Sequence, residues 1–155
     1  MSSSVDIEDP PPPYNEGGSS SSISYATSSS ITPGILRNTL LRYWTIAAET
    51  LVQIRNSNVS RIANISNCRN VKICGSRINN MRITSGELVV ITDCEVKGTL
   101  TIKGLDNVRI YSTRVTSLNI VDCRNVSINS VCVKVLKRTG NGVFHHLNSS
   151  VVHSL

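Results

Sequence analysis

Residues 105–137 read LDNVRIYSTRVTSLNIVDCRNVSINSVCVKVLK, and this stretch contains one pattern of apolar residues twice. Each copy has two apolar residues around a polar one, a single apolar residue, and then a further apolar burst: Val108-Arg-Ile110, Val115 and Leu118-Asn-Ile120, then Val126-Ser-Ile128, Val133 and Leu136. Such alternation predicts short β-strands whose alternate side chains point to one face. The repeat predicts that these strands come in sets of three.

The pattern extends upstream. Related bursts begin at Val71-Lys-Ile73 and Leu88-Val-Val90, so the starts 71, 88, 108 and 126 lie 17, 20 and 18 residues apart, and Val52-Gln-Ile54 begins a weaker copy. One such unit cannot bury its apolar face alone, whereas stacked units form a continuous core. We therefore predict an all-β fold, a short parallel β-helix of about five coils over residues 51–137. The unequal coil lengths favour the right-handed, three-sheet type over a left-handed hexapeptide helix.

Small residues recur at the expected corners. Asn70, Asn107 and Asn125 each precede the first Val of a coil, and Asn tolerates a left-handed backbone. Three residues before the coil starts stand Cys68, Ser85, Leu105 and Cys123, a predicted inner column. The chain has five cysteines, with no CxxC motif and no signal peptide. This usage predicts reduced thiols and a protein that is not secreted.

Three segments flank the repeats. Residues 1–34 are rich in Ser, Pro and Gly and predict a disordered arm. Residues 35–50 predict an amphipathic helix that caps the first coil, because apolar residues recur at spacings of three and four: Leu36, Leu40, Tyr43, Trp44, Ala47, Ala48 and Leu51. Residues 138–155 predict a polar tail that packs against a neighbouring subunit or capsid protein and not against its own core.

The charges are divided between the segments. Residues 1–34 hold four acids and no Lys or Arg, so all 16 basic residues follow them. Arg77 and Arg114 both stand six residues after a coil start, and Arg69 and Arg124 stand two residues before one. These positions predict outward basic columns that contact nucleic acid, an acidic capsid protein or an anionic membrane. Aromatic residues are few, which disfavours a stacking platform for single strands.

Catalysis is not predicted. Polysaccharide-cleaving β-helices need acids that converge on one face, but Asp93, Asp106 and Asp122 fall at different offsets from their coil starts. His145 and His146 are adjacent and point apart on any regular element, and His153 has no cysteine near it in sequence. We therefore predict no catalytic residues, no metal site and no cofactor.

The arm contains the motif Pro11-Pro12-Pro13-Tyr14. Prolines prearrange a polyproline II helix, and the aromatic-lined groove of a WW domain binds proline rings and the tyrosine of PPxY sequences. The arm resembles the PPxY late-domain arms of viral structural proteins. That resemblance implies docking of host WW-domain ubiquitin ligases of the HECT type.

Residues 51–137 resemble the right-handed β-helices of viral tailspikes and of the capsid-surface proteins encoded at the left end of atadenovirus genomes. The two resemblances together imply a non-enzymatic viral minor capsid or capsid-cementing protein. Its expected partners are capsid proteins, WW-domain ligases and further copies of itself, and its expected locations are the virion and the host cytoplasm and nucleus. Two alternatives stay open: a matrix-type protein that binds anionic membrane and promotes release, and a ubiquitin-ligase adaptor.

Overall fold

A computed structural model describes residues 21–24 and 34–155. These residues form twelve β-strands: β1 (Ser21–Ser24), β2 (Ile35–Arg37), β3 (Leu40–Ala47), β4 (Leu51–Arg55), β5 (Asn58–Cys74), β6 (Arg77–Thr92), β7 (Glu95–Tyr111), β8 (Arg114–Val121), β9 (Asn125–Asn129), β10 (Cys132–Thr139), β11 (Val143–Leu147) and β12 (Ser150–Ser154). No helix of the described part is long and apolar enough to cross a membrane.

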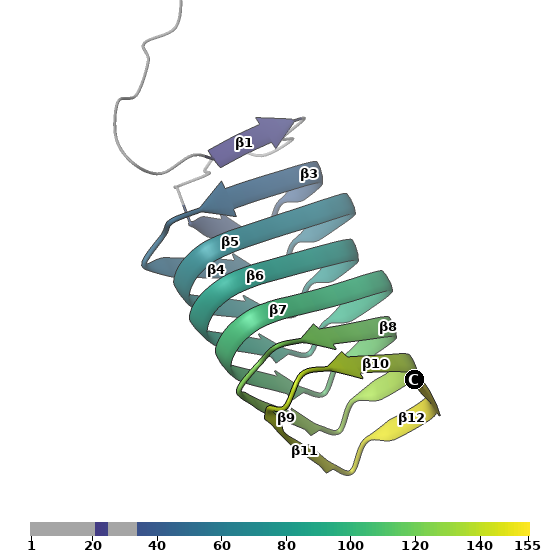
Figure 1. Cartoon of the computed structure of the whole chain (residues 1–155). Helices are drawn as coiled ribbons and strands as arrows, with labels where there is room; N and C mark the ends of the chain where they lie inside the picture. The colour runs from purple at the N-terminus through teal and green to yellow at the C-terminus, as the bar shows by residue number, and fades with distance from the viewer. Residues whose placement is uncertain (1–20, 25–33) are drawn as a thin grey trace, which may run out of the picture.

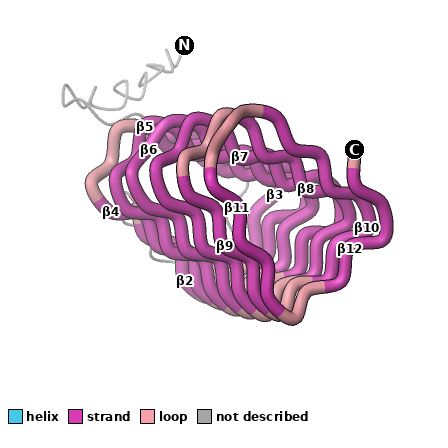
Figure 2. The backbone as a smooth tube through the Cα atoms, turned by 60° about the horizontal axis from the view of Figure 1, so that its bottom comes forward, coloured by secondary structure: helices cyan, strands magenta, loops and turns pink. Residues whose placement is uncertain are grey.

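The strands wind as a parallel β-helix, which confirms the predicted architecture (Figures 1 and 2). Every strand from β2 onward pairs in parallel with its counterpart in the neighbouring coil. The long strands β5, β6 and β7 bend around the solenoid and pass through more than one of its faces. The described residues make about seven coils, two more than predicted.

Each coil contributes to three faces, which we number in chain order. Sheet 1 contains 35–37, 51–55, 70–74, 88–92, 107–111, 125–129 and 143–147. Sheet 2 contains 40–41, 58–59, 77–78, 95–96, 114–115, 132–133 and 150–151. Sheet 3 contains 43–47, 62–66, 80–84, 99–103, 117–121, 135–139 and 153–154.

The core is a set of aliphatic rows that run from coil to coil. One row on sheet 1 consists of Val52, Val71, Val89, Val108 and Val126, all at most 3% exposed. Burying one such side chain contributes about 1.5–3 kcal/mol, so the rows supply the main stabilising term. The row also corrects the predicted register: the coil at 88–92 is aligned by its second apolar residue and not by its first.

The corner between sheets 1 and 2 has the same backbone conformation in all seven coils, and we call it the hydroxyl corner. Its first residue has a positive φ of 44–59° in each coil: Asn38, Asn56, Gly75, Asp93, Ser112, Ser130 and Asn148. The N–H of each of these residues, except the last, donates to a carbonyl of the next coil at 3.0–3.2 Å. The left-handed turn therefore lets the chain change direction without losing a hydrogen bond between coils.

The second residue of this corner points inward and is small. In five coils it is Ser or Thr, and its hydroxyl donates to the carbonyl two residues earlier at 2.7–2.9 Å: Thr39, Ser57, Ser76, Thr113 and Ser149. The same hydroxyl oxygen accepts an N–H from the preceding coil where Thr39 donates to Ser57, Ser57 to Ser76, Cys94 to Thr113 and Val131 to Ser149. Among the described residues, no buried side-chain nitrogen or oxygen lacks a hydrogen-bond partner.

The corner between sheets 3 and 1 also begins with a left-handed residue: Ala48, Asn67, Ser85, Gly104, Asp122 or Gly140. We call it the acidic corner, because it contains Glu49, Glu87, Asp106 and Asp122. The predicted left-handed positions Asn70, Asn107 and Asn125 lie three residues later and are strand residues. Asn125 and Asn107 form a ladder there, in which Nδ2 of the first donates to Oδ1 of the second at 3.4 Å.

The predicted capping helix over 35–50 is wrong, because these residues form the first coil through β2 and β3. Leu40 and Tyr43 belonged to the predicted apolar helical face, but their side chains are exposed, whereas Trp44 is buried. The corner at Asn38 shifts the alternation of apolar residues by one position. Two short strands out of phase thus imitate the spacing of a helix.

The segment 138–155 is likewise not a tail, because β11 and β12 form the seventh coil and pair in parallel with β9 and β10. Phe144 and Val151 are half-buried against the core, so the contact is intramolecular. The sequence pattern was weak because His146 and Ser154 occupy rows that hold Ile128 and Leu136 in the coil before.

The predicted disordered arm lies mostly outside the described residues. Within it, β1 pairs antiparallel with β3, and Ser21 lies opposite Ile46. This strand covers an edge of sheet 3 at the first coil, so backbone groups of β3 that face away from β5 have partners.

We predict that Ser112→Val destabilises the fold by about 1–2 kcal/mol, because a β-branched residue resists the left-handed backbone of the hydroxyl corner. Ser112→Gly should be at least as stable as the wild type, since glycine adopts that conformation without strain. Ser127→Val is the matched control on a strand, where valine is favoured. Urea denaturation measures all three variants, and equal losses in the two valine variants would contradict the role of the corner.

Candidate functional site

Stacking in register places equivalent residues of successive coils in rows, and these rows separate the charges. Four of the six acids in residues 34–155 lie at the corner between sheets 3 and 1: Glu49, Glu87, Asp106 and Asp122. Only two basic residues, Arg69 and Arg124, accompany them. This edge is therefore acidic on a domain that is basic as a whole.

The predicted basic column through Arg69 and Arg124 is mixed in charge. Arg69 Nε lies 3.6 Å from a carboxylate oxygen of Glu87, and Arg124 Nε lies 3.3 Å from one of Asp106. Both pairs are well exposed, so each contributes at most about 1 kcal/mol to stability. Their main effect is to cancel the charge of the two arginines.

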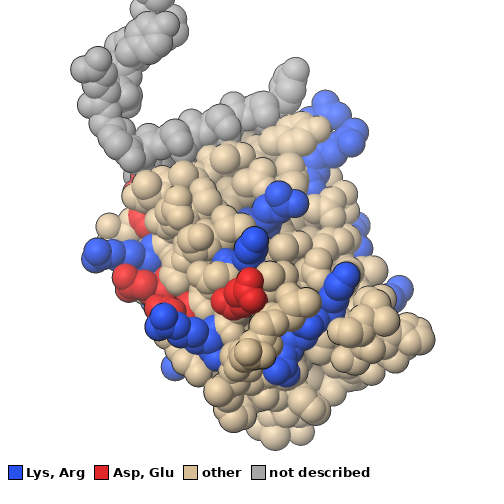
Figure 3. Space-filling model, in the orientation of Figure 1, with Lys and Arg blue, Asp and Glu red and all other residues tan. Residues whose placement is uncertain are grey.

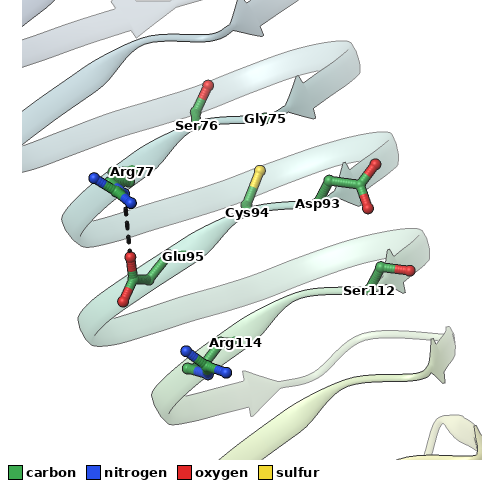
Figure 4. A pocket seen from close by; sticks show the side chains of 8 residues that line it. All are labelled: Gly75, Ser76, Arg77, Asp93, Cys94, Glu95, Ser112 and Arg114. Carbon is green, nitrogen blue, oxygen red and sulfur yellow. Dashed lines mark ion pairs between the residues drawn. The ribbon is translucent and has the colours of Figure 1, made fainter.

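Arg77 and Arg114 do share a column on sheet 2, as predicted, but Glu95 stands between them. Arg77 Nε lies 3.3 Å from a Glu95 carboxylate oxygen, and Arg114 forms no ion pair with any described residue. Figure 4 shows a shallow pocket beside this column. Arg77, Glu95 and Arg114 lie along sheet 2, and the hydroxyl corner contributes a fourth charged residue, Asp93.

The sequence does indicate that Glu87 and Glu95 share columns with the arginines, but the predicted register concealed this. Counted from Val89, Glu87 stands two residues before the coil start and Glu95 six residues after it, the offsets of Arg69 and Arg77 from Val71. Leu88, Val89, Val90 and Ile91 are all apolar, so alternation alone did not choose between the two phases.

A larger set of cations lies on sheet 2 and on the bend that joins it to sheet 3. Each of the first six coils contributes one exposed cation: Arg42, Arg61, Arg77, Lys97, Arg114 and Lys134. We call these six residues the cation row. In Figure 3 the red acidic atoms lie at the left and near the centre, whereas the right margin, where β5, β6 and β7 fold back in Figure 1, shows blue basic atoms and no red ones. The row and the acidic corner are thus at opposite edges of sheet 3.

The thiol in the pocket is poorly suited to nucleophilic chemistry. Burial raises the pKa of Cys94 to about 11, and hydrogen bonds from the backbone offset this only in part. Burial likewise raises the pKa of Cys68 and that of Cys123. These three thiols are protonated at neutral pH and act as small core residues.

Other candidate ligands are dispersed. Among the described residues, no group of three or more His, Cys, Asp or Glu side chains could hold a metal ion. The three histidines lie in the seventh coil, where the His146 ring is 6.3 Å from that of Phe144. The motif at Pro11, Pro12, Pro13 and Tyr14 lies outside the described residues. In comparisons with known proteins, no protein-family model, curated protein or solved structure matches this chain.

We predict that alkylation of the native protein with iodoacetamide at about pH 8 modifies Cys74 and Cys132 first, because both are exposed. With a pKa of about 11, only about a thousandth of Cys94 is thiolate at that pH. Peptide mass spectrometry after timed labelling should show Cys68, Cys94 and Cys123 reacting only once the protein unfolds. Rapid labelling of Cys94 in the folded protein would contradict its burial.

Proposed function

We propose that this chain is a non-enzymatic structural protein, a viral minor capsid or capsid-cementing protein whose PPxY arm docks host WW-domain ubiquitin ligases. The observation that carries the proposal is the order of two different segments along the chain. An acidic segment that contains a docking motif comes first, and a solenoid whose faces differ in charge follows it. Such a solenoid suits a role as a rigid platform, because each coil is hydrogen-bonded to its neighbours.

The faces support binding to a large partner and not to a small substrate. The outward side chains of sheet 2 are polar or charged in coils two to six, apart from Cys132. An anionic surface of a large partner complements this face. The acidic corner lies elsewhere and leaves the cations accessible.

The alternative of a matrix-type protein is less well supported. A peripheral membrane protein commonly inserts apolar side chains beside its cations. The large exposed apolar residues on sheet 2 and its bend are Leu40 in the first coil and Val152 in the seventh, so coils two to six expose none beside their cations. The ubiquitin-ligase adaptor shares the PPxY step and differs only in what the solenoid binds. The right-handed sense of the coils and the formation of homo-oligomers stay predictions.

The docking step is tested by pull-down with immobilised WW domains. Tyr14→Ala should lose at least tenfold in affinity, because the tyrosine side chain fills the recognition groove of the WW domain. Tyr25→Ala is the matched control, since it removes a tyrosine from the same segment outside a PPxY sequence. Unchanged binding of Tyr14→Ala, or an equal loss in both variants, would exclude PPxY docking.

The structural role is tested on purified virions stripped with detergent. A capsid-bound protein should remain with the particles and be released by high salt, because exposed charge pairs are screened. A matrix-type protein should leave with the membrane fraction. Recovery of the protein only in the soluble host fraction would favour the adaptor.

A further inference from the structure

The geometry points to a second binding activity: we propose that the cation row is a sequence-independent site for the phosphate backbone of duplex nucleic acid. This inference goes beyond the proposed function and does not depend on the PPxY motif. It rests on the arrangement of Arg42, Arg61, Arg77, Lys97, Arg114 and Lys134, one in each of six consecutive coils.

The six cations lie in two neighbouring columns: Arg77 and Arg114 belong to sheet 2 itself, and the other four lie two or three residues further along the chain, at the bend. Neighbouring coils are about 4.8 Å apart in the direction of the hydrogen bonds, so the six cations extend over roughly 24 Å. All six side chains are exposed. Arg77 and Arg114 pair with both neighbouring coils, whereas the other four cations lie at the bend, between the paired segments of sheets 2 and 3. Paired strand segments precede and follow the bend in each of these coils, so binding does not have to order the protein backbone.

Little opposes an anion on this face. Two acids lie beside the six cations: Glu95 on sheet 2, whose carboxylate is paired with Arg77, and Asp93 at the hydroxyl corner, which lines the same pocket. Neutral donors lie between the cations on the outward positions: Asn58, Ser60, Asn79 and Thr116. Phosphate contacts in protein–DNA complexes come from this mixture of basic, amide and hydroxyl side chains.

The side chains on sheet 2 and its bend favour a nucleic-acid duplex over single strands and membranes. Sheet 2 and its bend carry no aromatic side chain in the described coils, so they offer no platform on which unpaired bases stack. Coils two to six expose no large apolar side chain there for insertion into a bilayer. A duplex backbone presents a dense line of charge, one per 3.4 Å of each strand, which needs no matching register with the coils.

The test measures fluorescence anisotropy of a labelled mixed-sequence duplex of about two helical turns with the full chain. The logarithm of the affinity should fall linearly with the logarithm of the salt concentration, with a slope of up to about −3.6 if Arg61, Lys97, Arg114 and Lys134 neutralise four phosphates. Arg61→Gln with Lys97→Gln should reduce the magnitude of the slope by about 1.8, because two phosphate contacts are lost.

The matched control is Arg109→Gln with Lys103→Gln, which makes the same change in net charge on sheets 1 and 3. This control should keep the wild-type slope, and both double variants should keep the wild-type circular dichroism spectrum and WW-domain binding. An equal change of slope in the two variants would overturn the proposal, because affinity would then follow net charge alone. Tighter binding at equal salt to anionic vesicles or to polyglutamate than to the duplex would overturn it in favour of a membrane or an acidic protein.

Discussion

The left-handed residue at the hydroxyl corner is the constraint on which the rest of the structure depends. Sheets 1 and 2 meet at a sharp angle, and an L-amino acid turns the chain there only at a conformational cost of about 1–2 kcal/mol. Seven residues at this position accept that conformation, and in six of them the N–H still reaches a carbonyl of the next coil. In five of the seven coils the hydroxyl that follows donates to the carbonyl two residues earlier, and four of these hydroxyls also accept an N–H from the preceding coil. Because the turn is the same in each coil, the coils superpose and the strands stay paired.

Superposition of the coils explains both the core and the surface. Alternate residues of each strand fall on continuous rows, so aliphatic residues meet aliphatic residues inside and charged residues meet charged residues outside. At the acidic corner the outer rows mix Arg69 and Arg124 with carboxylates that pair with them. On sheet 2 and its bend, each of the first six coils carries one exposed cation, and Glu95, the one acid of sheet 2, pairs with Arg77. The solenoid thus converts a scattered set of charges into two edges of opposite character, and the functional proposals rest on this separation.

The central coils were predictable because their apolar alternation repeats at nearly constant intervals. The two end coils were not. In the first, the corner at Asn38 offsets two short strands and produces the spacing of a helix. In the seventh, rows that are aliphatic elsewhere hold His146 and Ser154, so the alternation is faint. The continuous apolar run Leu88–Val89–Val90–Ile91 allowed two registers, and only pairing of Val89 with Val71 and Val108 chose between them.

By itself, the sequence determined the class of fold and the sign of the net charge of the repeat domain. Periodicity and composition can be read along the chain without knowing which residues are neighbours in space. It placed Arg77 and Arg114 in one column because both stand at the same offset from a coil start. Only the tertiary structure decided which acids neutralise which arginines and which cations share a face. Arg42, Arg61, Lys97 and Lys134 fall at the bend after sheet 2, where the strand register shifts between several coils. Because that shift differs from coil to coil, equal positions in space correspond to unequal offsets along the chain, and residue counting does not reveal the row.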